Sequence, residues 1–178
     1  EEYNGTSWTE VADLNTSRIS IMGAGANAEA CLAFGGAVSS PPTVATNATE
    51  SWDGSSWTEV NNLNTARYGG YGAGTLTAAL VSGGIVGPGT MQSVTETWDG
   101  TSWTETGDLS TARGRLSMAG TTTAAVASTG QSPSLTTATE EFTLSITTTT
   151  AGAWASGGDT TDTFASCFGA GTQTAALK

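Results

Sequence analysis

Charged residues that could bind an anion or hold a carboxylate recur in this chain at fixed intervals. The arginines follow one another at steps of 49 and 46 residues, and glutamates recur in step with them: Arg18, Arg67 and Arg113, with Glu1, Glu50, Glu96 and Glu140. A guanidinium group holds a carboxylate in a planar, bidentate fork. The spacing therefore predicts ion pairs between strands, and a ring of arginines that binds a ligand is the alternative.

Other side chains give little support for catalysis. The chain has no histidine, which is the commonest general base and a common metal ligand. Cys31 and Cys167 consequently lack a histidine partner that would activate a thiolate. No Asp-x-Asp-x-Asp run offers the convergent oxygens of a calcium site. We therefore expect no enzyme activity, no cofactor and no metal.

Aromatic residues also recur in pairs. Each pair flanks an Asx-Gly sequence that is typical of a hairpin turn: Tyr3 and Trp8, Trp52 and Trp57, Trp98 and Trp103. Because the same positions return in each repeat, we interpret Trp8, Trp57 and Trp103 as packing residues between neighbouring sheets. A sugar-stacking platform is the alternative.

The elements that position these residues are predicted to be short strands. In the second repeat, small residues at 67–74 and apolar residues at 76–82 indicate two strands that end at the diglycine Gly83-Gly84. A polar loop over 85–93 precedes strands at 94–98 and 102–105. No segment has the apolar spacing of an amphipathic helix, so the chain is predicted to be all-β. A repeat period near 50 residues is typical of propeller blades of four strands.

The repeats divide a single domain, 1–178, into four units at approximately 1–49, 50–95, 96–139 and 140–178. The fourth unit departs from the pattern, with an insertion around Thr147–Thr150 and Phe164 in the place of the arginine. The chain begins with the outer two strands of a blade and ends with the sequence of the inner two. Two interpretations stay open: a four-bladed ring closed by pairing of the terminal hairpins, or part of a longer array.

This pattern resembles the kelch repeat. The resemblance rests on the diglycines, the Glu-x-aromatic-Asx-Gly turn, the Trp that follows it and the later Leu-x-Thr-x-Arg, and it covers residues 1–130 best. It implies a kelch-like β-propeller. Kelch-type copper oxidases have a similar fold, but their histidine-based site cannot be built from this sequence.

Composition limits the partners. A formal net charge of −11 argues against binding to nucleic acid or to an anionic membrane surface. No apolar run is long enough to span a bilayer, so membrane insertion is not expected. Asn4, Asn15 and Asn47 begin matches to the N-glycosylation pattern. The irregular region 131–163, with Gln131, Pro133, Thr147 and Thr150, is the predicted interface with a partner.

The wording of the repeat is also similar to kelch-like proteins encoded by bacteriophages of aquatic bacteria, which are taken to be virion components. This likeness implies a non-enzymatic fibre or decoration protein at the virion surface, which assembles with itself or with other virion proteins and contacts host glycans. The alternative is a secreted or cell-surface glycoprotein that forms fibrils or adhesive arrays.

Overall fold

The computed structural model describes residues 1–39 and 43–144, together with the backbone of 153–156. Within these ranges the chain forms strands, turns and irregular segments but no helix. The all-β prediction is therefore confirmed. Glycine, serine and threonine supply turns and small strand residues throughout, as the sequence indicated.

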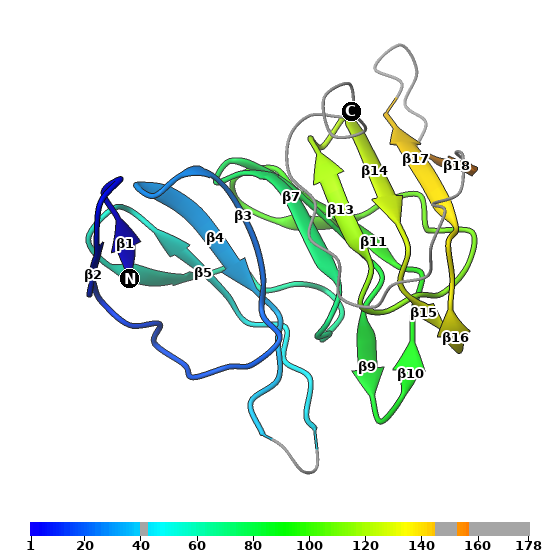
Figure 1. Ribbon diagram of the computed structural model, residues 1–178, viewed down its shortest axis with the longest axis horizontal. Helices are drawn as coiled ribbons and strands as arrows, with labels where there is room; N and C mark the ends of the chain where they lie inside the picture. Colours follow the sequence, from blue (N-terminus) through cyan, green and yellow to red (C-terminus); the bar gives the residue numbers. More distant parts are fainter. Residues whose placement is uncertain (40–42, 145–152, 157–178) are drawn as a thin grey trace.

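Three four-stranded antiparallel sheets form most of the structure (Figure 1). The first contains β3 (Met22–Asn27), β4 (Ala30–Phe34), β5 (Thr49–Trp52) and β6 (Trp57–Val60). The second contains β7 (Tyr71–Thr75), β8 (Ala78–Ser82), β11 (Thr95–Trp98) and β12 (Trp103–Glu105). The third contains β13 (Ser117–Gly120), β14 (Ala124–Ser128), β17 (Thr139–Thr143) and β18 (Ala153–Ser156). A separate hairpin at the N-terminus pairs β1 (Glu2–Tyr3) with β2 (Trp8–Thr9).

The same cross-strand register returns in every sheet. Four pairs of aromatic residues occupy matching cross-strand register positions: Tyr3 and Trp8, Trp52 and Trp57, Trp98 and Trp103, Phe142 and Trp154. The last pair confirms that the fourth strand of the degenerate repeat is displaced along the sequence but keeps its place in the sheet. The N-terminal hairpin is equivalent to the third and fourth strands of a sheet.

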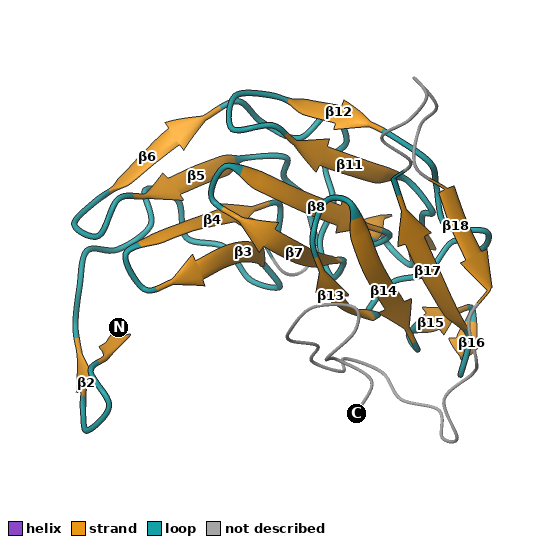
Figure 2. Cartoon of the chain, turned by 90° about the horizontal axis from the view of Figure 1, so that it is seen from above, coloured by secondary structure: helices purple, strands orange, loops and turns teal. Residues whose placement is uncertain are grey.

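The sheets follow one another along an arc, with β3, β7 and β13 on its concave side (Figure 2). Glycine is required there because the backbones approach closely. A Cβ atom on Gly72 would lie 2.4 Å from the carbonyl oxygen of Gly23 and 2.5 Å from Cζ of Phe34. The Gly-Ala-Gly sequences of β3 and β7 thus allow the first two sheets to pack at the inner edge, whereas β13 has Met118 at the position of the first glycine.

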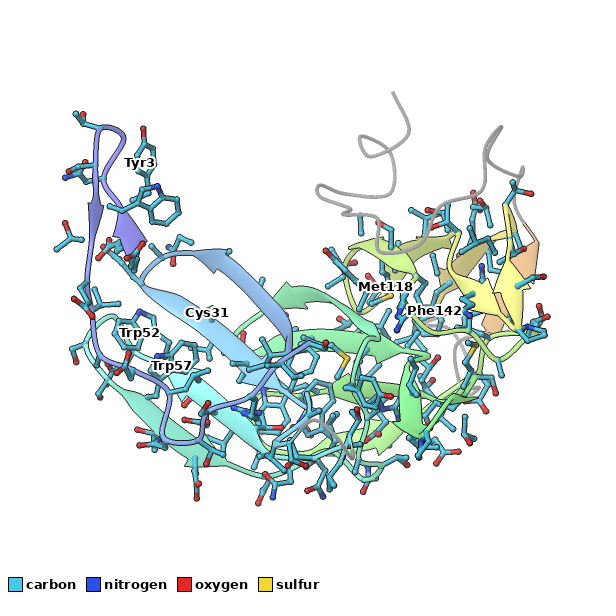
Figure 3. All side chains as sticks on the ribbon, turned by 60° about the horizontal axis from the view of Figure 1, so that its bottom comes forward. Tyr3, Cys31, Trp52, Trp57, Met118 and Phe142 are labelled. Atoms are coloured by element: carbon cyan, nitrogen blue, oxygen red, sulfur yellow. The ribbon has the colours of Figure 1, made fainter. Side chains whose placement is uncertain are left out.

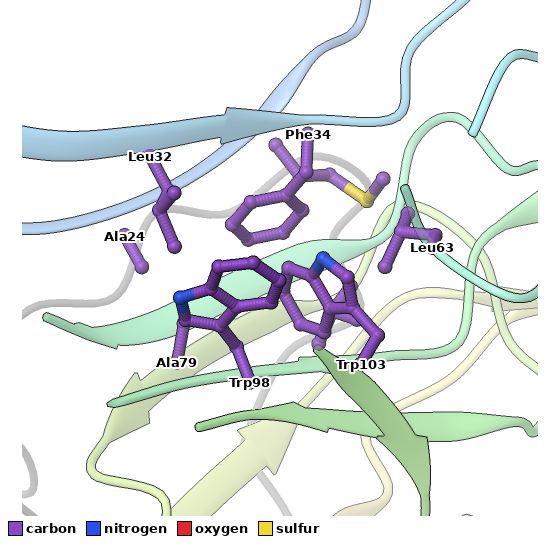
Figure 4. Packing of buried hydrophobic residues seen from close by; sticks show 9 residues of the cluster. Ala24, Leu32, Phe34, Leu63, Ala79, Trp98 and Trp103 are labelled. Carbon is purple, nitrogen blue, oxygen red and sulfur yellow. The ribbon is translucent and has the colours of Figure 1, made fainter. Parts of the chain in front are cut away.

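Two apolar clusters fill the spaces between the sheets. The first joins the first and second sheets around Phe34, which packs edge-on against Trp103 with ring centroids 4.9 Å apart (Figure 4). The second joins the second and third sheets and contains Leu80, Leu116 and Phe142. The core of this protein is therefore a series of interfaces between sheets.

The segment predicted as a polar loop, 85–93, contains strands. Residues 85–91 form a short hairpin, β9 (Ile85–Gly87) with β10 (Thr90–Met91). A second hairpin pairs β15 (Gln131–Ser132) with β16 (Ser134–Leu135). The region 131–163, which we expected to be irregular, thus begins with the same element as the corresponding part of the second repeat.

The turn after the second strand of the third sheet has Thr129 in place of the first glycine of the diglycine. Gly83 and Gly84 have φ angles of 65° and 107°, and Thr129 and Gly130 adopt nearly the same values, 60° and 106°. Thr129 is a buried β-branched residue in the left-handed region, and its Oγ1 has no hydrogen-bond partner. Both features cost free energy.

We expect Thr129→Gly to stabilise the protein by about 1 kcal/mol, because relief of strain and of the unpaired hydroxyl outweighs the greater backbone entropy of glycine. Chemical denaturation measures this change. Gly83→Ala is the matched opposite: its Cβ would lie 2.4 Å from the carbonyl oxygen of Arg113, so this variant should be destabilised. Destabilisation by Thr129→Gly would contradict the strain argument.

Several sequence predictions lie outside the described residues. They concern the insertion at Thr147–Thr150, Cys167, the substitution at Phe164 and the inner-strand sequence near the C-terminus.

Candidate functional site

Each recurring arginine forms a buried ion pair with the glutamate of the third strand of its sheet. The pairs are Arg18 with Glu50, Arg67 with Glu96 and Arg113 with Glu140, at N–O distances of 2.6, 2.7 and 2.6 Å. These side chains are almost completely buried. The predicted ion pairs are therefore confirmed.

The Nη1 nitrogen of each guanidinium group donates to backbone oxygens. Nη1 of Arg67 donates to the carbonyl oxygens of Gly83 and Val94, and Nη1 of Arg113 donates to those of Thr129 and Ala138. Each arginine thus joins the end of the second strand to the start of the third. Such an arginine fixes the position of two strands, and its side chain is buried, so a ligand cannot reach it from solvent. The Nε atoms of Arg18 and Arg113 have no hydrogen-bond partner among the described residues.

Each glutamate has a further partner that sequence reasoning missed. The second carboxylate oxygen of Glu96 accepts from the backbone and side-chain amides of Asn64, at 2.8 and 3.0 Å. Asn15 binds Glu50 in the same way, whereas Ser110 supplies its backbone amide alone to Glu140. The sequence feature that could have indicated this partner is the asparagine of Leu-Asn-Thr-x-Arg, which stands three residues before the arginine in the first two repeats.

Burial lowers the pKa of Arg67, and the negative charge of Glu96 opposes that change. The same two causes act on the pKa of Arg113, with Glu140 as the partner. Arginine remains charged in proteins even when its pKa is depressed. The site consequently holds two opposite charges in a dry environment, which positions the backbone but offers no proton to a substrate.

The paired aromatic residues touch in the first three repeats but differ in burial. Ring centroids are 5.2 Å apart in Tyr3–Trp8, 5.3 Å in Trp52–Trp57 and 5.4 Å in Trp98–Trp103. Trp103 is buried against the first sheet, Trp57 is half-buried and Trp8 is 65% exposed. Figure 3 shows Tyr3 on a hairpin that stands away from the sheets. The predicted role in packing between sheets therefore holds for Trp98 and Trp103 of the second sheet. Tyr3 and Trp8 have no neighbouring sheet to pack against among the described residues.

The Asx-Gly turns are closed by their own side chains. Oδ1 of Asp53 accepts hydrogen bonds from the backbone amides of Ser55 and Ser56, at 2.9 and 2.8 Å, and from the Ser55 hydroxyl. These bonds, the Ser55 hydroxyl first, lower the pKa of Asp53 to about 2. Asn4 accepts equivalent bonds from Thr6 and Ser7 without a charge.

We expect the Asp53 turn to lose stability only in strong acid. Because the folded pKa is depressed, its contribution is complete above the ordinary aspartate value of about 3.9 and is lost as the pH falls toward about 2. Asp53→Asn keeps the acceptor and removes the titration. The difference in stability between wild type and variant should therefore be constant above pH 4 and change below it. A carboxyl titration by NMR with a midpoint near 4 would contradict this prediction.

The three glycosylation candidates differ in how their amides are used. Nδ2 of Asn15 donates to Glu50 and to the carbonyl oxygen of Trp57. An N-linked glycan replaces one amide hydrogen, so it would remove one of these bonds, and the structure argues against Asn15 as an acceptor. Asn47 donates one hydrogen bond to Leu63, and Asn4 is exposed.

The predicted interface residues are only partly described. Gln131 and Pro133 lie in the β15–β16 hairpin, where the side-chain amide of Gln131 donates to the carbonyl oxygen of Pro133. Thr147 and Thr150 lie outside the described residues.

The inner strands enclose an open hollow of about 610 Å³ on the concave side. Its wall includes Gly23, Gly72, Gly74, Met118 and Gly120. Cys31 also lines it, and burial raises the pKa of that thiol. Among the described residues, no charged side chain lines the hollow. Such a wall has neither a general base nor a cation-binding group.

No group of three or more histidine, cysteine, aspartate or glutamate side chains is arranged in the described part of the chain to hold a metal ion. No described helix is long and apolar enough to cross a membrane.

Comparisons with known proteins identify the fold alone. No family model matches the chain, and no curated protein matches it. A solved structure described as "Structure of YjhT" is similar, with a TM-score of 0.67 and 12% sequence identity. The match covers 82% of this chain and 47% of that chain, so this chain spans less than half the length of that protein.

Proposed function

We propose that this chain is a non-enzymatic structural protein of a phage virion, in which the sheets are blades of a kelch-like β-propeller. The observation that carries the structural role is the use of the recurring charged residues. All three described arginine–glutamate pairs are buried and bonded to backbone, so they hold strands in position. The virion assignment rests on the likeness of the repeat to phage-encoded kelch-like proteins.

The propeller proposal is supported by the arc of repeated sheets. Each sheet has the same strand order and register, and the first strand of each sheet lies on the concave side (Figure 2). The hairpin of β1 and β2 has the aromatic register of the outer half of a blade. We propose that an inner hairpin completes this blade.

The sequence near the C-terminus is suited to that position. Residues 169–177 read Gly-Ala-Gly-Thr-Gln-Thr-Ala-Ala-Leu, and residues 72–80 of the second sheet read Gly-Ala-Gly-Thr-Leu-Thr-Ala-Ala-Leu. A hollow of about 370 Å³ lies where such strands would pack, and it is lined by Cys31, Trp52 and Trp57. Further blades of a longer array could complete the same position.

A disulfide cross-link tests this closure. Cys31 has the same register position as Ala125 of the third sheet. Ala125 packs in one cluster with Leu80 of the second sheet, and Leu177 corresponds to Leu80 in the repeat. If the C-terminal segment packs on the first sheet, Leu177 should therefore lie close to Cys31. Leu177→Cys in a Cys167→Ser background should form an intrachain disulfide with Cys31 on mild oxidation. Gln173→Cys, at the predicted turn, is the matched control. Equal cross-linking of both variants, or of neither, would contradict closure by this segment.

The proposed virion role is tested by asking whether the protein is found in purified phage particles. We expect peptides of this chain to co-purify with intact phage particles through a density gradient, and antibodies against it to label one structural position on them. Recovery in the cell envelope or the medium alone would overturn the proposal.

A secreted or cell-surface glycoprotein that forms fibrils or adhesive arrays is the second candidate. It is favoured by the exposed Asn4 in a glycosylation pattern and by the exposed aromatic pair Tyr3 and Trp8, which could stack on a sugar. Intact mass spectrometry that shows glycan on Asn4 or Asn47 would support this candidate. Host glycan contact by a virion protein would use the same aromatic pair.

A further inference from the structure

Three protrusions leave the same end of the molecule, one from each sheet. They are the loop described at 36–39 and 43–48, the β9–β10 hairpin and the β15–β16 hairpin (Figure 1). Each connects the second strand of its sheet to the third. We call this end of the molecule the hairpin face.

The bases of the protrusions are bonded to one another. The amide of Gly69 donates to the carbonyl oxygen of Ser20, and the amide of Arg115 donates to that of Gly69. Each base also pairs with its own protrusion, through bridges between Ile19 and Ala37, Tyr68 and Ile85, and Gly114 and Gln131. The three protrusions therefore stand side by side on one continuous support.

Most exposed large apolar side chains of the described chain gather here. Val38, Val44, Val86 and Leu135 are 47%, 47%, 37% and 46% exposed on the protrusions. Ile19, which is 54% exposed, and Ile21 lie at the base of the first. Tyr3 and Trp8, on the separate N-terminal hairpin, complete this set. A group of exposed apolar residues of this kind marks an interaction site.

The hairpin face is also uncharged in a strongly acidic protein. No residue of 36–39, 43–48, 84–94 or 130–138 is Asp, Glu, Lys or Arg, although the formal net charge of the chain is −11. The three arginine–glutamate pairs beneath the protrusions are buried, and two exposed charged groups lie close by. Arg115 is exposed at the third base, and the Asp108 carboxylate accepts a hydrogen bond from the amide of Thr95, just beyond the second protrusion.

This distribution of charge favours a second copy of the chain as the partner of the hairpin face. Two copies that approach through their acidic surfaces repel each other, whereas contact through the hairpin faces buries apolar side chains and keeps the carboxylates at a distance. A two-fold axis through this face would bring the same residues of both copies together. We propose that the hairpin face is a self-association surface that binds the hairpin face of a second copy. This inference deepens the structural role proposed above and rests on it.

Sedimentation of the full 178-residue chain over a range of concentrations tests the proposal. We expect a reversible dimer that strengthens between 20 and 500 mM NaCl, because salt screens the repulsion between the acidic surfaces. The triple variant Val38→Asp/Val86→Asp/Leu135→Asp should weaken the dimer roughly 100-fold, because its charges would be buried at the contact. Thr75→Asp/Thr77→Asp/Thr101→Asp adds equal charge on exposed residues at the opposite end and is the matched control.

A second variant tests the same contact without charges that could disturb folding. Val86→Thr/Leu135→Thr removes apolar surface without adding charge and should weaken the dimer roughly 10-fold. A wild-type chain that stays monomeric would overturn the inference, as would a dimer that weakens with salt or that the control weakens as strongly as the triple variant. A face that binds only a neutral polysaccharide or a different protein would also overturn it. The proposed virion role is judged separately, because a monomer found in purified particles would leave that role standing.

Discussion

Replacing Arg67 by methionine is expected to lower the free energy of unfolding by about 3–5 kcal/mol, since it leaves a buried carboxylate without its opposite charge. Glu96 would keep its bonds to Asn64, but the carbonyl oxygens of Gly83 and Val94 would lose their shared donor. Chemical denaturation at neutral pH measures the loss. Arg115→Met is the matched control, because this exposed arginine bonds through its side chain only to Gln131 among the described residues. Its change should be close to zero.

The double variant Arg67→Met/Glu96→Leu separates the cost of an unpaired charge from the value of the pair. Replacing both members of a buried pair by apolar residues is often close to neutral. We therefore expect the double variant to be more stable than Arg67→Met alone, although the two carbonyl oxygens remain unpaired. A loss below 1 kcal/mol in Arg67→Met would mean that the ion pair is not buried in solution.

Trp103→Ala is expected to cost about 3–5 kcal/mol, because this side chain fills the interface between the first two sheets. It packs against Phe34 and Trp98, and the cavity left behind would be surrounded by well-ordered strands (Figure 4). The loss of stability in chemical denaturation, followed by far-ultraviolet circular dichroism, measures this cost.

Trp57→Ala is the comparison for Trp103→Ala, since both residues have the same register position in successive sheets. Trp57 is half-buried, so its loss should cost about half as much. An equal cost at both positions would indicate that Trp57 is covered in solution, as closure by an inner hairpin requires. A small cost at Trp103 would contradict the packing of the first two sheets.

The candidate site could be predicted in part because its residues repeat. Arg67 and Glu96 were paired from their recurrence alone, since a guanidinium group and a carboxylate are complementary in charge and hydrogen bonding. The expected bidentate geometry was not found: Nη2 of Arg67 binds Oε1 of Glu96, and the other carboxylate oxygen binds Asn64. The role of Asn64 was missed because the sequence does not show that its amide reaches the carboxylate of a strand about thirty residues later. Register across the sheet decides that contact.

The sequence by itself determined the all-β class, the repeat of four strands and the identity of the ion pairs, because these depend on turn residues, alternation and fixed intervals. Only the tertiary structure decided which repeated residues are equivalent in environment. Trp103 and Trp8 have the same local sequence, yet one is buried and the other exposed, because burial depends on whether a neighbouring sheet is present. The same holds for the hairpin face. Its residues lie far apart in the chain, and only the hydrogen-bonded bases bring them to one surface.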